Sequence, residues 1–120
     1  MKGRTLTIRL QADWKAALRQ AGAKAKARRY QGEELNFESP AAFFGRLTER
    51  RWELVRALQG QGPLAVRELA RRVGRDVKRV HEDVRTLIDL GLVERAERGV
   101  TCPFATVRID MELRPKRLAA

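Results

Sequence analysis

Four polar side chains between positions 78 and 85 have types and a spacing suited to contacting another macromolecule: Lys78, Arg79, Glu82 and Arg85. In an α-helix, residues three or four positions apart lie on one face, so these side chains would project from one side of a helix. Lysine, arginine and glutamate form hydrogen bonds with base edges, and the two basic types also bind phosphate. The pattern therefore favours a helix that contacts nucleic acid.

The stretch that must position these residues, 66–95, contains two sets of apolar residues at helical spacing. Each set falls on one face of an amphipathic helix: Val66, Leu69, Ala70 and Val73, then Val77, Val80, Val84, Leu87 and Ile88. A Gly74-Arg75 break separates them, Asp76 suits the N-cap of the second helix, and Gly91 suits its left-handed end. This pattern is typical of a helix-turn-helix reader, and equally of two surface helices whose charges form a solvated face.

The order of elements around this helix pair decides between the two interpretations. Ser39-Pro40 predicts a helix start, Thr48 caps a longer helix, and the 59–63 loop ends it. After Gly91, Leu92-Val93 begins a strand, and 96–99 supplies a polar turn that contains Arg98 and follows Arg95. Residues 107–113 then alternate apolar and polar types, although Cys102-Pro103 interrupts this second half. Three helices followed by a hairpin predict a winged helix-turn-helix domain over 39–114.

A small strand-helix-strand unit is predicted ahead of this domain, in residues 1–38. Strands are expected at 5–10 and 35–37, with a helix over about 12–29, so the fold class is α+β. The apolar sides of this unit need a cover, which either the following helices or a second copy of the chain could supply. A cluster of Lys24, Lys26, Arg28 and Arg29 complements the helix dipole or contacts a partner. Residues 115–120 are expected to be a tail.

Residue types that support catalysis or metal binding are scarce. His81 and Cys102 are each the single residue of their type, which excludes a His/Cys metal cluster within one chain. The adjacent carboxylates Glu33-Glu34 and Glu82-Asp83 do not converge on one point in a strand or a helix. We therefore expect no enzyme activity, no metal and no cofactor, with His81 in a packing or phosphate-contact role at the edge of the buried helix face.

The overall charge indicates the class of partner. The 120-residue chain carries a formal net charge of +11, which favours a polyanion, nucleic acid before membrane or acidic protein. A membrane-surface helix would need bulky apolar residues, whereas the basic helix predicted before Gly32 is mostly alanine on its apolar side. The single cysteine and the lack of a long apolar run predict a cytoplasmic protein with no membrane association.

The segment from Phe44 to Val93 resembles a prokaryotic family of small predicted transcriptional regulators with MarR-like winged helices. The resemblance is carried by Leu47-Thr48 with Arg51-Trp52, by the block from Val66 to Ala70, and by Asp83 to Leu92. It implies sequence-specific binding of double-stranded DNA, usually by a dimer, and some members are antitoxin-like proteins encoded beside a toxin. One departure is Ala65, which stands where such proteins generally have a Ser or Thr cap.

These inferences together predict a homodimeric repressor, which regulates its own operon in the simplest case. Lys78, Arg79 and Glu82 are expected to read bases, and Arg71, Arg72 and Arg85 to lie near the DNA backbone. Arg75 in the turn belongs to the same DNA-binding set, and Arg95 and Arg98 are expected to contact the minor groove or its phosphates. The alternatives are an interaction protein that neutralises a toxin-like partner and a protein that binds structured RNA.

Overall fold

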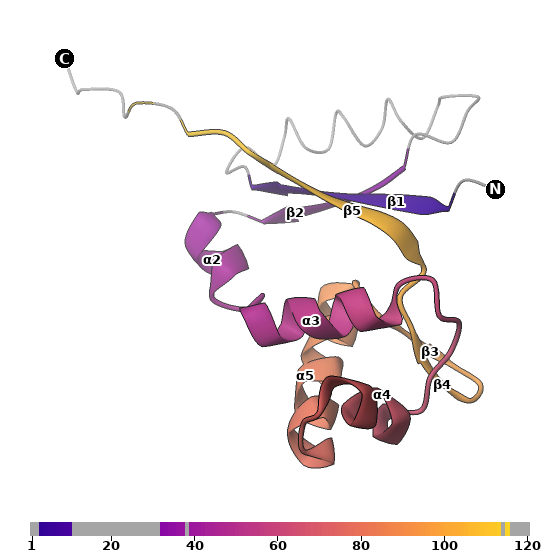
Figure 1. The fold of residues 1–120 in the computed structure, drawn as a ribbon. Helices are drawn as coiled ribbons and strands as arrows, with labels where there is room; N and C mark the ends of the chain where they lie inside the picture. The colour runs from indigo at the N-terminus through magenta and orange to yellow at the C-terminus, as the bar shows by residue number, and fades with distance from the viewer. Residues whose placement is uncertain (1–2, 11–31, 38, 114, 116–120) are drawn as a thin grey trace.

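A three-stranded parallel sheet pairs a strand from the beginning of the sequence with one from near its end (Figure 1). We analysed a computed structural model, which describes residues 3–10, 32–37, 39–113 and 115. Strand β1 (Arg4–Leu10) lies in the middle, between β2 (Glu33–Phe37) and β5 (Phe104–Met111). In β1, Leu6, Ile8 and Leu10 are buried while the residues between them are half-buried, as the alternating sequence predicts.

Strand β5 corrects the predicted hairpin. The predicted wing corresponds only to a hairpin of β3 (Glu94–Ala96) and β4 (Gly99–Thr101), which pair antiparallel. Beyond Pro103 the chain leaves the hairpin, and β5 pairs parallel with β1, so that Leu6 lies opposite Val107 and Ile8 opposite Ile109. The predicted strand at 107–113 is therefore real over most of its length, but its assignment to the wing is wrong. Alternation defines which side chains share a face, and it does not define which strand lies alongside.

The parallel pairing also determines how the predicted segments 1–38 and 39–114 are connected. Strand β1 pairs with β5 within one chain, so the second segment supplies a strand to the sheet of the first. The fold is thus a small α+β body in which helices and sheet share one core. The predicted helix over 12–29, with Lys24, Lys26, Arg28 and Arg29, lies outside the described residues, as does the predicted tail apart from Pro115.

The helices begin where the sequence predicts. Helix α2 (Pro40–Phe44) starts with proline, and the Ser39 hydroxyl accepts a hydrogen bond from the Ala42 amide at 3.1 Å. Helix α3 (Glu49–Leu58) is capped in the same way by Thr48, whose hydroxyl accepts from the Arg51 amide. By contrast, Ala65 makes no side-chain cap at the start of helix α4 (Val66–Val73), as its side chain requires. Helix α5 (Val77–Leu90) follows after a three-residue connection.

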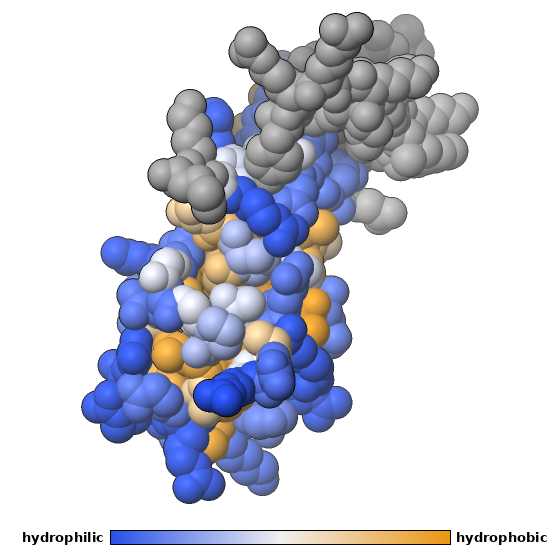
Figure 2. All heavy atoms as spheres, turned by 90° about the vertical axis from the view of Figure 1, so that its right-hand side faces the viewer, coloured by the Kyte–Doolittle hydropathy of each residue, from blue (hydrophilic) through white to orange (hydrophobic). Residues whose placement is uncertain are grey.

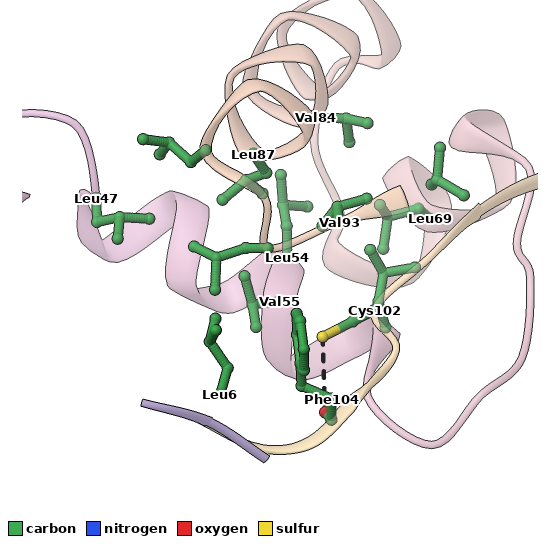
Figure 3. Close-up of a cluster of buried hydrophobic side chains, with 14 of the residues drawn as sticks. Leu6, Leu47, Leu54, Val55, Leu69, Val84, Leu87, Val93, Cys102 and Phe104 are labelled. Atoms are coloured by element: carbon green, nitrogen blue, oxygen red, sulfur yellow. Dashed lines mark hydrogen bonds between the residues drawn. The ribbon is translucent and has the colours of Figure 1, made fainter. Parts of the chain in front are cut away.

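The core lies where α3, α4 and α5 meet the hairpin and the sheet (Figure 3). Leu54 and Val55 of α3 are at its centre, with Leu69 from α4 and Leu87 from α5, and all four are at most 1% exposed. Residues from distant parts of the sequence close it: Leu6 from β1, Val93 before the wing, and Phe104 from β5. Because one core holds the helices and the sheet, the outward face of α5 has a fixed orientation relative to the wing.

Candidate functional site

Helix α5 presents its N-terminal half away from the core. Val80, Val84, Leu87 and Leu90 are buried, whereas Lys78, Arg79, Glu82 and Arg85 are all exposed. A shallow hollow on this exposed side is lined by Lys78, Glu82 and Arg85 together with Asp76, Val77 and His81. The structure thus brings three of the four predicted residues to one surface. Arg79 lies apart from them, on a second hollow that it shares with Glu49, Arg50, Glu53 and Arg75.

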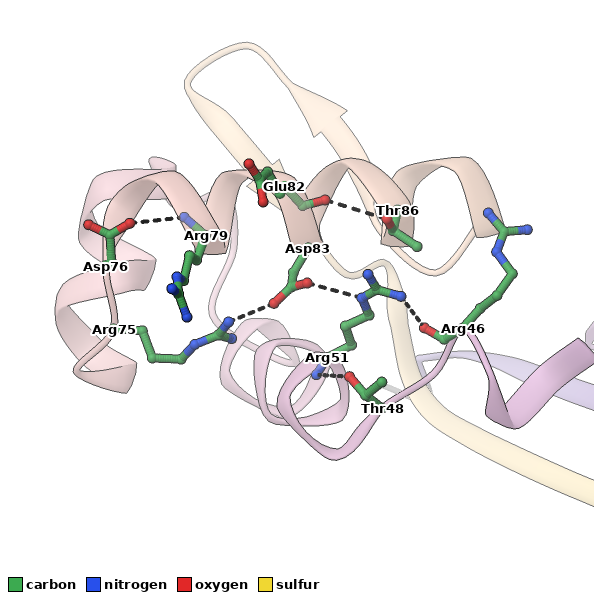
Figure 4. Close-up of polar contacts among 9 residues, drawn as sticks. All are labelled: Arg46, Thr48, Arg51, Arg75, Asp76, Arg79, Glu82, Asp83 and Thr86. Atoms are coloured by element: carbon green, nitrogen blue, oxygen red, sulfur yellow. Dashed lines mark hydrogen bonds and ion pairs between the residues drawn. The ribbon is translucent and has the colours of Figure 1, made fainter. Parts of the chain in front are cut away.

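The turn before α5 fixes the start of that surface. Gly74 adopts a left-handed conformation (φ 68°), and its backbone N–H closes the end of α4 on the carbonyls of Ala70 and Arg71. The Asp76 carboxylate then accepts from the Arg79 amide at 3.2 Å, which confirms the predicted N-cap (Figure 4). At the other end, Gly91 is left-handed (φ 87°), as predicted. Both boundaries of α5 are therefore set by local sequence.

Asp83 holds α5 against the neighbouring elements (Figure 4). Its carboxylate accepts from Arg75 Nη2 at 2.7 Å and from Arg51 Nε at 3.0 Å, and thereby ties α5 to the turn and to α3. Burial alone would raise the pKa of Asp83, but the hydrogen bonds from Arg75 and Arg51 outweigh it and hold this pKa below its ordinary value. Glu82, by contrast, is exposed, so the two adjacent carboxylates diverge as expected.

This contact changes the interpretation of Arg75, which the sequence placed among the DNA-binding residues. Its side chain is only 14% exposed and is paired with Asp83. A guanidinium buried in an ion pair has little freedom to bind a phosphate as well. Arg75 therefore positions the turn in this structure, and Arg51 and Asp83, which sequence reasoning left out, act with it. The sequence does contain a sign of this ion pair. Asp83 lies four residues after Arg79, and a carboxylate on the inward side of a predicted helix needs a basic partner.

Arg71 and Arg72 of α4 form a surface cluster around Glu68. Glu68 accepts from Arg71 Nε at 2.7 Å and from Arg72 Nε at 2.8 Å, and Arg72 also donates to Gln61. The hydrogen bonds from Arg71 and Arg72 lower the pKa of Glu68 to about 2, so the carboxylate is ionised at neutral pH. Both arginines remain exposed, with 72% and 39% of their side chains accessible. They lie on α4, separate from the hollow on α5.

The wing carries its two predicted arginines on the outside. Arg95 lies in β3 opposite Val100, Arg98 lies in the turn, and both are exposed. The hairpin is anchored to the loop before α4, because the backbone groups of Leu64 and Val100 exchange hydrogen bonds of 2.8 and 2.9 Å. Viewed from this side, hydrophilic side chains surround much of the end that carries α4 and the hairpin (Figure 2). The hairpin thus holds Arg95 and Arg98 on the outside in a fixed position, with the exposed carboxylates of Glu94 and Glu97 beside them.

Val77 and His81 are the residues of this surface that sequence reasoning misplaced. Val77 was assigned to the apolar face of α5, yet it is 41% exposed, and His81 is exposed instead of lying at the edge of the buried face. The periodicity places Val77 on the same side as Val80, but the packing of α5 begins one turn later. An exposed valine at the first turn of a polar helix face is a specific feature of this surface.

No group of metal-ligating residues is present within the described part of the chain. Cys102 is buried, and its thiol donates to the Phe104 carbonyl at 3.7 Å. Burial raises the pKa of this thiol, so it is a poor nucleophile at neutral pH. No described helix has the length and apolar character needed to cross a membrane.

Comparison with protein families identifies a match over the helices and the hairpin described above. The family model HVO_A0114 matches residues 46–109, more than half of the chain. The chain belongs to the HVO_A0114 family. A comparison of the chain with curated proteins found no match. The HVO_A0114 region includes α3, α4, α5, the hairpin and β5 as far as Ile109, and it begins after β1 and β2. The family definition thus contains the exposed face of α5 together with the helices and hairpin that position it.

Proposed function

We propose that this protein is a sequence-specific, double-stranded DNA-binding transcriptional regulator with a winged helix-turn-helix fold, acting as a homodimer. The observation that carries the proposal is the exposed N-terminal half of α5, where Lys78, Glu82 and Arg85 surround one hollow clear of the core. A recognition helix uses this part of its length to reach base edges in the major groove.

The composition of this face suits direct readout. Lys78 donates to guanine acceptors, Glu82 accepts from cytosine, and the exposed methyl groups of Val77 match the thymine methyl. Arg85 lies one to two turns further along α5, where a cation contacts the flanking phosphates. Arg79, on the other side of the helix start, either reads a base at the groove edge or binds the backbone of the opposite strand. The mixture of donor, acceptor and apolar groups favours DNA reading over a uniformly solvated face.

The neighbouring basic residues extend the same surface. Arg71 and Arg72 are exposed on α4, and Arg95 and Arg98 are exposed on the hairpin. These groups suit phosphates on either side of the groove that α5 would occupy, and the wing arginines suit the adjacent minor groove. The formal net charge of +11 supports the same partner class. Arg75 has no place in this interface because Asp83 already binds it.

The test is selection of bound duplexes from a randomised library, followed by titration of the enriched duplex at several salt concentrations. We expect the selection to enrich one sequence motif. If about six phosphates are neutralised, the slope of log affinity against log salt concentration should be about −5. Competition with an RNA duplex of the same length separates DNA from RNA as the ligand. Failure to enrich any motif, or an affinity that does not depend on salt, would contradict the proposal.

A further inference from the structure

Strand β5 is one of the two outer strands of the three-stranded sheet, and its sequence is unusual for such a position. One of its edges pairs with β1, and no described strand pairs with the other. In Figure 1, the C-terminal end of β5 leads away from α3, α4 and α5. An unpaired edge presents a row of N–H and C=O groups that can accept another strand. Soluble proteins usually block such an edge with charge, proline or a bulge.

On one face of β5, apolar side chains leave this edge open. Ile109 is 46% exposed and Met111 is 41% exposed, and Val107 on the same face is half-buried. Their partners in β1, Leu6, Ile8 and Leu10, are buried, so the apolar face of the sheet continues outward to β5 and ends there uncovered. A strand that is both exposed and apolar on one face is suited to burial against a further strand.

We propose that β5 pairs antiparallel with β5 of a second copy of this chain, with the two-fold axis at Ile109. The pairing would join two sheets into one continuous six-stranded sheet, doubling the three strands of each. With a two-fold axis perpendicular to the sheet, a residue that precedes Ile109 by some number of positions lies opposite the partner residue that follows Ile109 by the same number. Ile109 then meets its own copy, Val107 lies opposite Met111 of the partner subunit, and Arg108 lies opposite Asp110 of the partner subunit.

The charges on the other face of β5 select this register. Arg108 is exposed and has no ion-pair partner among the described residues, whereas Asp110 accepts from Arg9 Nη1 at 2.7 Å and retains lone pairs for a second donor. With the axis at Ile109, two Arg108–Asp110 pairs form across the interface. An axis at Asp110 would oppose two aspartates, and one at Met111 would oppose Asp110 and Glu112, both of which are unfavourable.

This inference gives an interface to the dimer in the proposed function, and it is tested without DNA, so the two can fail separately. We expect wild type to sediment with twice the mass of one chain. Arg108→Asp places like charges opposite each other twice, and Asp110→Lys does the same with positive charges. Each variant alone should shift toward monomer by at least about tenfold in dissociation constant. Arg67→Asp on α4 is the matched control and should remain dimeric, because Arg67 is exposed and forms no ion pair with a described residue.

Mixing the two variants is the decisive experiment. An Arg108→Asp chain and an Asp110→Lys chain present opposite charges at both cross-strand positions, so they should form a heterodimer although neither forms a homodimer. Circular dichroism of each variant verifies that it is folded, and recovery of the heterodimer verifies this independently. A monomeric wild type, unchanged dimers in both variants, or a mixture that stays monomeric would each overturn the proposal. A wild type that pairs only with a different protein would also overturn it.

Discussion

Removal of the Asp83 charge should destabilise the protein more than removal of any exposed carboxylate. Asp83 accepts one charge-assisted hydrogen bond from Arg75 and one from Arg51. Each is worth about 1.5 to 3 kcal/mol when buried. The three side chains are 14% to 23% exposed, so solvent screens part of this energy. For Asp83→Asn we expect the free energy of unfolding to fall by about 2 to 3 kcal/mol. This is less than the loss of about 3 to 5 kcal/mol seen when a fully buried ion pair is broken.

The measurement is urea unfolding followed by circular dichroism, with Glu82→Gln as the matched control. Glu82 neighbours Asp83 on α5 but is exposed and forms no ion pair with a described residue, so its substitution should change the free energy of unfolding by less than about 0.5 kcal/mol. The urea dependence of the unfolding free energy should be the same in both variants. If Asp83→Asn unfolds with the same free energy as Glu82→Gln, the ion pairs do not hold α5 in place.

The same variant gives a pH test with a defined sign. The pKa of Asp83 is lower in the folded protein than its ordinary value of 3.8, so its ionised form stabilises the fold. This contribution is complete well above pH 3.8 and is lost as pH falls through the lower folded pKa. The difference in stability between wild type and Asp83→Asn should therefore be constant near neutral pH and shrink below pH 3.8. A difference that grows on acidification would refute the reasoning.

Three further substitutions test other parts of the account. Gly99→Ala should cost more than about 2 kcal/mol, because Gly99 has φ 151° and a Cβ there would lie 2.1 Å from the Leu64 carbonyl oxygen; thermal unfolding measures it. Asp76→Ala removes the cap of α5 and should cost about 1 kcal/mol in urea unfolding, whereas Asp76→Ser should restore most of it. Val77→Ala should leave stability within about 0.5 kcal/mol of wild type and weaken the preference for thymine at one site position by about 1 kcal/mol in competition titrations.

Local features of the fold were predictable because local sequence determines them. Ser39, Thr48 and Asp76 cap helices through their own side chains, and Gly91 ends α5 because it tolerates a left-handed backbone. The buried positions of α5 followed from their spacing, with the exception of Val77. That residue is exposed although Val80, in the same first turn, is fully buried, and periodicity does not show where the packed face of the helix ends.

The partner of β5 and the role of Arg75 required the three-dimensional structure. The alternation at 107–111 fits pairing with β4 or with β1 equally well, and only the path after Pro103 decides for β1. Arg75 and Lys78 are both basic residues near one turn, but only Arg75 lies within reach of Asp83. The direction of each side chain decides which of two similar cations pairs with an internal carboxylate. Neither composition nor residue spacing indicates that direction.

The central claim is that α5 reads DNA sequence, and the most direct test compares the affinities of wild type and two variants for the enriched duplex and for a scrambled one. Lys78→Ala should lose about 1 to 3 kcal/mol on the enriched duplex and clearly less on the scrambled duplex, so that specificity falls. Arg56→Ala, an exposed arginine on α3, is the matched control and should leave the ratio of the two affinities unchanged. Equal losses for Lys78→Ala on both duplexes, or none on either, would contradict the account.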